Sequence, residues 1–218
     1  MDKCRRIVLK QVKLLGIFGG TFDPIHYGHL IAAQYASDEF NLDKVLIVPT
    51  ARPPHKEIEN VEDELHRYNM VLLAVQDNPV FEVSTLEMDR KGYSYTVDTI
   101  AYCCEKHPES QLFLIIGADC LLQMYTWKDV ESLVTMCNFI VVTRPGYAVK
   151  PSDKALTRLP AAIWSRLKYL EVPGFDISSS TIRERVARGK TIKYLVPPEV
   201  ENYIFEKGLY RQEEKADD

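Results

Sequence analysis

Two histidines that stand three positions apart, a few residues after a glycine pair, are the residues of this sequence best suited to chemistry. Residues 14–30 read LLGIFGGTFDPIHYGHL, with His26 and His29 following Gly19 and Gly20. Side chains three apart at the start of a helix share one side, so both imidazoles could contact one ligand. Imidazole titrates near neutral pH, and a protonated or hydrogen-bonding pair suits the negative charge that grows on a phosphoryl group during displacement.

Two other interpretations of the histidine pair remain open at this point. A metal site would need a third ligand, and the sequence has neither an HExxH pattern nor a CxxC pair to supply one. Alternatively, one histidine caps the helix and the other packs, which is common for an isolated HxxH pattern. The flanking residues therefore decide how the pair is interpreted.

A strand and a helix are needed to place these groups. The apolar run from Leu14 to Phe18 predicts a short buried strand, and the glycine pair after it lets the backbone approach a ligand closely. Apolar residues at helical spacing predict a helix that begins near Tyr27 or Gly28. The unpaired N–H groups and partial positive charge at a helix start favour an anion in the loop between the two elements.

With its flanking residues, the histidine segment is similar to a known signature. GGTFDPIHYGH resembles the HxGH element of the nucleotidylyltransferase superfamily, whose members move a nucleoside monophosphate from a triphosphate to a phosphate-bearing acceptor. ISSSTIR at 177–183 resembles their ISSTxxR element, with serine at 180 where threonine is common. The resemblance implies that the catalytic residues are His26, His29 and Arg183. It implies that the ATP-binding residues are Gly19, Gly20, Thr21, Phe22, Lys56, Ser178, Ser180 and Thr181.

The second segment also has a physical basis for binding phosphate. Three serines, residues 178–180, are helix-capping residues, and Arg183 lies in the first turn of the helix that follows. Hydroxyls, free N–H groups and one guanidinium then converge, and arginine can engage phosphate with two parallel hydrogen bonds. Serines before a helix are most often simple caps. Two such signals near opposite ends of one domain make phosphate binding the better interpretation.

Three further stretches resemble the bacterial-type nicotinate mononucleotide adenylyltransferases. They are PPHK at 53–56, SYTVDTI at 94–100 and GADCLLQMYTWKD at 117–129. The resemblance implies that Lys56 adds a positive charge near the phosphates, and that the acceptor is bound by Tyr95, Thr96, Asp119, Trp127 and Arg144. Simpler interpretations stay open for each: a surface loop for 53–56, a helix cap at Tyr95, a core tryptophan, and structural pairs for Asp119 and Arg144.

The order of apolar runs predicts an α/β fold, a doubly wound and mostly parallel sheet with helices on both faces. Strands are predicted at 45–48, 81–83, 112–116, 139–142 and 169–172, and helices at 61–76, 97–107, 127–136, 181–188 and 198–207. Ligands of such sheets bind at the carboxyl ends of the strands. We expect one domain over residues 1–210 and a loose tail over 211–218.

Composition narrows the class of protein. The chain has 218 residues, 46% of them hydrophobic, and a net charge of −4, because 27 Lys and Arg face 31 Asp and Glu. This charge balance argues against a broad basic surface that binds nucleic acid. Five cysteines without metal-ligand spacing predict reduced thiols. With neither a signal peptide nor a membrane-length apolar run, we expect a cytoplasmic protein that does not bind membranes, and leave homo-oligomers open.

The reaction implied by the resemblance is transfer of AMP from ATP to nicotinate mononucleotide, giving the dinucleotide and pyrophosphate. The acceptor phosphate is already mostly ionised at pH 7, so direct in-line displacement needs no strong base and no covalent intermediate. We expect Mg²⁺ to be bound mainly through the substrate phosphates, with no protein metal residue. Alternatives are another acceptor, such as phosphopantetheine, a cytidylyl transfer, a noncatalytic nucleotide-binding protein and, last, an aminoacyl-tRNA synthetase fragment.

Trp127 gives a first test, because a stacking role and a core role predict different kinetics. Replacing Trp127 by Ala should raise the KM for the pyridine mononucleotide several-fold and leave the KM for ATP nearly unchanged, since an aromatic contact contributes about 0.5–1.5 kcal/mol beyond area burial. Steady-state kinetics with each substrate varied in turn measure this. Equal effects on both KM values would indicate a structural tryptophan.

Overall fold

Six parallel strands form the centre of the molecule, in the order β3-β2-β1-β4-β5-β6. The computed structural model describes residues 12–53, 61–146, 155–174 and 176–211. The strands are β1 (Leu14–Gly20), β2 (Lys44–Pro49), β3 (Phe81–Val83), β4 (Gln111–Gly117), β5 (Asn138–Thr143) and β6 (Leu167–Glu171). The predicted α/β sheet is therefore confirmed, and all six described strands are parallel.

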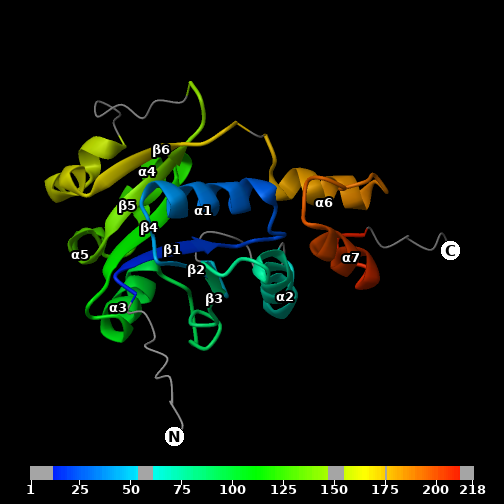
Figure 1. Cartoon of the computed structure of the whole chain (residues 1–218), viewed down its shortest axis with the longest axis horizontal. Coiled ribbons are helices and arrows are strands. Elements are labelled where there is room, and N and C mark those ends of the chain that lie inside the picture. Colours follow the sequence, from blue (N-terminus) through cyan, green and yellow to red (C-terminus); the bar gives the residue numbers. More distant parts are fainter. Residues whose placement is uncertain (1–11, 54–60, 147–154, 175, 212–218) are drawn as a thin grey trace, which may run out of the picture.

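Helices follow the strands along the chain (Figure 1). They are α1 (Tyr27–Glu39), α2 (Glu64–Val75), α3 (Thr96–Lys106), α4 (Ala118–Gln123), α5 (Val130–Met136), α6 (Ser179–Ala187) and α7 (Pro198–Glu206). Short 3-10 turns lie at Met124–Thr126, Leu156–Arg158 and Ala161–Ser165.

The helices cover both faces of the sheet, because successive side chains of a strand point to opposite faces. On central strand β4, Leu112 and Leu114 belong to a core cluster with apolar residues of α3, α4 and α5. The intervening Phe113 and Ile115 belong to a second cluster with residues of α1, α2, α6 and α7. A strand buried on both sides must be apolar throughout, and this explains the unbroken LFLII run in β4.

The strand order reverses between β1 and β4, and this reversal creates the space for a site. From β1 the chain passes through α1 to β2 on one side, while β4 and β5 extend the sheet on the other. The loops after β1 and β4 therefore leave the carboxyl edge in opposite directions, and a crevice opens between them. Figure 1 shows that α6 lies beside the N-terminal end of α1.

The segment around Trp127 differs from its prediction. We expected a helix over 127–136, but α5 begins at Val130, and Trp127 is extended with φ −75° and ψ 153°. Asp129, in the left-handed region at φ 48°, caps α5 by accepting a hydrogen bond from Ser132 N–H. An Asp side chain that bonds its own backbone favours such a helix start over helix continuation. The short helix α4 was not predicted either.

Several expectations concern residues at the margin of the described chain. Lys56 lies outside the described residues, as do 212–218 of the expected tail, while Arg211 donates a hydrogen bond to Phe205 O.

Cys103, Cys104, Cys120 and Cys137 are free thiols. Within the described ranges, none of the helices has the length and apolar character to cross a membrane.

Gly16 in β1 gives a test of the packing. A Cβ there would lie 2.8 Å from Leu42 Cδ1 and 3.3 Å from Ile115 Cδ1, both in the core. Gly16→Ala should lower stability by about 1–3 kcal/mol, or roughly 2–12 °C in Tm, because overpacking displaces the neighbours. Thermal unfolding followed by circular dichroism measures this. The matched control is Gly19→Ala, because a Cβ added at residue 19 would have nothing within 4 Å of it. An equal loss of stability in both variants would contradict this explanation.

Candidate active site

A cavity of about 790 Å³ lies at the carboxyl edge of the sheet, between the ends of β1 and β4. The starts of α1, α3 and α4 and the segment before α6 contribute to its wall. Most of the residues that the sequence suggested line this one cavity: Gly19, Gly20, Thr21, Phe22, His26, His29, Tyr95, Thr96, Asp119, Trp127, Arg144 and Ser178.

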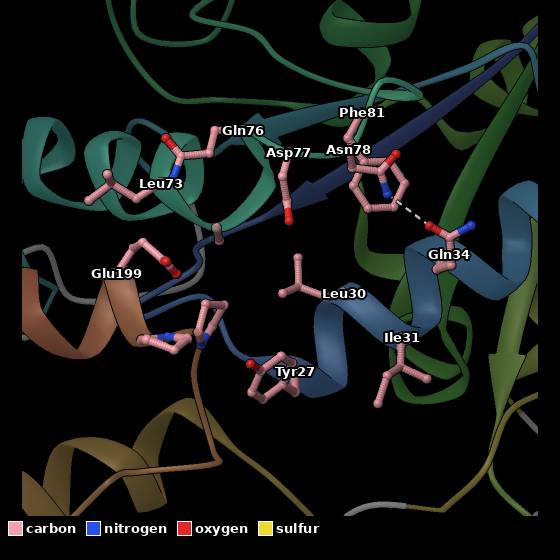
Figure 2. A pocket seen from close by; sticks show the side chains of 13 residues that line it. Tyr27, Leu30, Ile31, Gln34, Leu73, Gln76, Asp77, Asn78, Phe81 and Glu199 are labelled. Atoms are coloured by element: carbon pink, nitrogen blue, oxygen red, sulfur yellow. Dashed lines mark hydrogen bonds between the residues drawn. The ribbon is translucent and has the colours of Figure 1, made fainter.

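A second hollow, of about 540 Å³, lies elsewhere on the molecule (Figure 2). It is bordered by α1, by the end of α2 and by the start of α7, with Leu30, Asp77 and Glu199 directed toward it. Asn78 Nδ2 donates to Gln34 Oε1 at 2.8 Å across one side of it. None of the expected site residues that the structure describes lines this hollow, so the larger cavity is the candidate site.

The two histidines stack against each other at the start of α1. Their ring centroids lie 3.7 Å apart with an angle of 25° between the planes. The backbone N–H of His26 donates to His29 Nδ1 at 3.3 Å, so a neutral His29 carries its proton on Nε2. Phe22 packs edge-on against His29, with ring centroids 5.1 Å apart. His26 is the N-cap residue of α1, yet both rings also line the cavity, so capping and ligand contact are compatible.

His26 is a buried imidazole with an unsatisfied nitrogen. Its side chain is 5% exposed, and Nδ1 has no hydrogen-bond partner among the described residues. Burial, and then the positive charge of Arg144, lower the pKa of His26 from 6.5 to about 4. His26 is therefore neutral at pH 7, and of the two forms considered above the hydrogen-bonding imidazole fits better than imidazolium. An anion bound beside the ring would raise that pKa again.

Gly28, between the two histidines, is required by the position of the His26 ring. A Cβ at residue 28 would lie 3.0 Å from both Cε1 and Nδ1 of His26. Any side chain at this position would therefore displace the imidazole. We had not named Gly28 as a site residue, although the HxGH pattern contained the signal.

The serines before α6 form a hydroxyl cluster. Ser178 is the N-cap, and its Oγ accepts a hydrogen bond from Thr181 N–H at 3.1 Å. The same Oγ lies 3.1 Å from Ser180 Oγ and 2.8 Å from Thr181 Oγ1. Ser178 lines the cavity, whereas Ser180, Thr181 and Arg183 lie outside the cavity lining. The cap interpretation of Ser178 is thus correct, and the cap still faces the cavity.

Arg183 contacts the histidine loop. Its Nη1 donates to Asp23 O at 2.7 Å and lies 3.6 Å from Asp23 Oδ2. Ser179 Oγ donates to Pro24 O at 2.9 Å, and Tyr210 Oη donates to Asp23 Oδ1 at 2.7 Å. These bonds fix the start of α6 against the loop that precedes α1. We had not named Asp23, which is 3% exposed, because the residues that make it useful lie far away in the sequence.

The expected acceptor residues gather at another part of the wall. Tyr95 is the N-cap of α3 and Thr96 its first residue, so free N–H groups face the cavity there. Lys128 Nζ lies 4.5 Å from the Tyr95 ring centroid and pairs with Asp98 Oδ2 at 3.1 Å. Asp119 stands in the first turn of α4, and half-buried Trp127 packs against the core cluster while also lining the cavity.

Arg144 forms an ion pair with Asp176, whose side chain is almost fully exposed. The Nη1 to Oδ1 distance is 3.1 Å, and exposed pairs of this kind contribute little to stability. Arg144 also lines the cavity and is close enough to lower the pKa of His26. Its positive charge is therefore positioned near His26.

Arg67 is a buried side chain that sequence reasoning missed. It is 1% exposed, and its guanidinium donates to Thr21 O, Thr50 O and Ala51 O at 2.8, 2.6 and 3.1 Å. It thereby joins the loops after β1 and β2. Arg67 lies on α2, where a charged residue normally indicates a solvated face, so only the fold reveals its partners.

Comparisons with known proteins agree with this fold. The sequence model of the cytidylyltransferase-like family matches residues 17–185, which defines the class as nucleotidylyltransferases. A probable nicotinate-nucleotide adenylyltransferase from Moorella thermoacetica is 52% identical over 198 residues, covering 90% of this chain and 91% of the relative. One from Thermoanaerobacter sp. is 49% identical over 202 residues, covering 92% and 96%. The chain therefore belongs to the nicotinate-nucleotide adenylyltransferases within that class.

A solved structure supports the fold independently. Plasmodium falciparum nicotinic acid mononucleotide adenylyltransferase complexed with NaAD matches with a TM-score of 0.75 over 91% of this chain and 97% of that one. The sequences are 23% identical, so the likeness concerns the fold.

Arg183 and Arg185 provide a matched pair on α6. Each bonds one carbonyl, Arg183 that of Asp23 and Arg185 that of Thr191, but only Arg183 reaches the histidine loop. Arg183→Ala should lower kcat at least about 100-fold, as the loss of one charge-stabilising donor does. Its Tm should fall by only a few degrees. Arg185→Ala should keep kcat within about twofold, and parallel losses of kcat and Tm in both variants would show that Arg183 is only structural.

Proposed function

We propose that this chain transfers AMP from ATP to nicotinate mononucleotide, releasing pyrophosphate, and that the large cavity is where both substrates meet. The observation that carries this proposal is the arrangement within one cavity: stacked His26 and His29, and Ser178 before α6, with Tyr95 and Trp127 also in the wall. Phosphate-binding groups and groups suited to a flat aromatic ring are thus available together. This is what an adenylyl transfer to a pyridine nucleotide requires.

The histidines and Arg183 act on the phosphates of ATP in this proposal. His26 and His29 stabilise the negative charge that develops on the α-phosphate and its bridging oxygen, by hydrogen bonding from imidazole N–H groups. Arg183 and the serine hydroxyls stabilise the departing pyrophosphate. Arg183 Nη1 bonds the Asp23 carbonyl, so the guanidinium engages the triphosphate either while keeping this bond or by exchanging it.

The acceptor contributes its own nucleophile. A phosphate monoester has a second pKa near 6, so the oxygen that attacks the α-phosphorus is mostly ionised at pH 7. The protein then accelerates the displacement by positioning and charge stabilisation. Tyr95 and Thr96 offer N–H groups to the anionic end of the acceptor, and Trp127 offers a flat partner to the pyridine ring.

In this proposal Mg²⁺ binds together with ATP. Among the described residues, no group of three or more His, Cys, Asp or Glu side chains comes together that could hold a metal ion. A Mg²⁺ ion that binds phosphate oxygens and retains several waters fits such a site, since this ion often takes few protein ligands. It would neutralise part of the triphosphate charge.

Pyrophosphate release tests the proposed function directly. We expect the enzyme with ATP and Mg²⁺ to release pyrophosphate on addition of nicotinate mononucleotide, and more slowly or not at all with nicotinamide mononucleotide or phosphopantetheine. A coupled phosphate assay in the presence of pyrophosphatase measures each rate in parallel. Release with phosphopantetheine alone would refute the acceptor, and no release with any of the three would refute the enzymatic activity.

A further inference from the structure

Glu87 is a buried acidic residue in the cavity wall that belongs to neither signature. It lies in the loop between β3 and α3, the residue is 6% exposed, and it lines the cavity together with Thr50, Ser94 and Thr99. Burying a carboxyl group has a free-energy cost unless hydrogen bonds compensate for the lost water. Apolar residues at such a place often give equal or greater stability. The position of Glu87 beside a ligand cavity therefore suggests a role beyond folding.

Thr99 connects Glu87 to the first turn of α3. Its Oγ1 donates a short hydrogen bond of 2.6 Å to Glu87 Oε1 and accepts one of 2.8 Å from Arg90 Nη2. The same hydroxyl lies 3.4 Å from Tyr95 O, so its single proton goes to the nearer carboxyl oxygen. The chain of bonds from Arg90 through Thr99 to Glu87 fixes the loop against the helix one turn beyond Tyr95.

A second connection fastens the same loop to the end of β2. Ser94 N–H donates to Arg52 O at 3.0 Å, and Arg52 N–H donates to Ser94 Oγ at 3.4 Å. Ser94 immediately precedes Tyr95, so both sides of the helix start are anchored. Glu87 is located where these two connections meet.

The carboxyl group itself is in an unusual environment. Burial raises the pKa of Glu87, while the hydroxyls of Thr99, Ser94 and Thr50 and the charge of Arg90 favour the ionised form and oppose that rise. Arg90 Nη2 is 4.0 Å from Oε1, and Oε2 has no hydrogen-bond partner among the described residues. Glu87 is thus oriented mainly by neutral hydroxyl groups, which fix the position of its carboxyl group without neutralising its charge.

We infer that Glu87 is a positioning residue for the acceptor: through Thr99 it fixes the first turn of α3, so that Tyr95 and Thr96 present their N–H groups where the anionic end of the acceptor binds. The identity of the acceptor rests on the proposed function. The position of the first turn of α3 does not depend on which acceptor binds. The two can therefore be tested separately.

Kinetics test the effect on the acceptor. Glu87→Ala and Thr99→Val should each raise the KM for nicotinate mononucleotide about tenfold, as expected for a displaced hydrogen-bonding site, while the KM for ATP stays within about twofold. The conservative variants Glu87→Gln and Thr99→Ser retain the bond and should restore the KM to within about threefold of wild type. Thr135→Val is the matched control, because it removes an exposed hydroxyl from α5 that bonds only Ser132 O.

Hydrogen exchange tests the positioning without any substrate. The amides of Asp98 and Thr99 both donate to Tyr95 O in the first turn of α3. They should exchange at least about fivefold faster in Glu87→Ala and Thr99→Val than in wild type, while the Leu133 amide of α5 stays unchanged as an internal reference. NMR detection resolves the individual amides.

The outcomes separate the two proposals. Unchanged exchange at Asp98 and Thr99, equal increases in both KM values, or a Thr99→Ser variant as impaired as Thr99→Val would each overturn the positioning role. A wild-type enzyme that releases no pyrophosphate with nicotinate mononucleotide would instead overturn the proposed function. In that case the exchange measurement would still decide whether Glu87 positions the helix.

Discussion

The bond between Arg183 and the carbonyl of Asp23, 160 positions away in the sequence, is the contact on which the site depends. Together with the bond from Ser179 to the Pro24 carbonyl, it brings the start of α6 to the start of α1. The histidines and the serine cap could each bind one phosphate alone. This contact and the Ser179 bond fix their spacing, and a triphosphate needs a fixed spacing if its α-phosphate is to react while its β- and γ-phosphates are bound. Tyr210, just beyond α7, adds a third bond to the same loop through the Asp23 carboxylate.

The chain has a net charge of −4, so the positive potential for an anionic substrate must arise locally. Three kinds of group supply it without a basic surface. Helices α1 and α3 begin at the cavity and direct the positive ends of their dipoles toward it. Arg144 lines the wall, and the carbonyls of Thr21 and Thr50 accept hydrogen bonds from Arg67, which is not part of the cavity lining. Carbonyls bonded in this way cannot point their negative ends into the cavity.

Much of the architecture was predictable because local signals coincide with the fold. The LFLII run, the glycine pair and the helical spacing after Tyr27 predicted β4, the end of β1 and α1, all of which the structure contains. His26, His29 and Ser178 were identified from spacing and capping chemistry together with the resemblance to two sequence signatures, all of which are local properties. Their roles in the reaction stay predictions.

The residues that sequence reasoning missed act through partners far along the chain. Asp23 contacts Arg183 and Tyr210, Arg67 contacts loops after two other strands, and Glu87 contacts Thr99 on the next helix. Nothing in their own neighbourhoods distinguishes them from surface charges. Trp127 shows the opposite error, since helical spacing suggested a helix that the left-handed Asp129 prevents from starting before Val130.

The central claim is that one triphosphate spans the histidine pair and the start of α6. A crystal structure with a nonhydrolysable ATP analogue and Mg²⁺ tests it most directly. The account predicts the α-phosphate within hydrogen-bond distance of His26 or His29, and the β- and γ-phosphates at Ser178 and the first turn of α6, with Arg183 reaching them. An analogue whose phosphates contact only one of these two segments, or that binds in the hollow beside α2 and α7, would contradict the account.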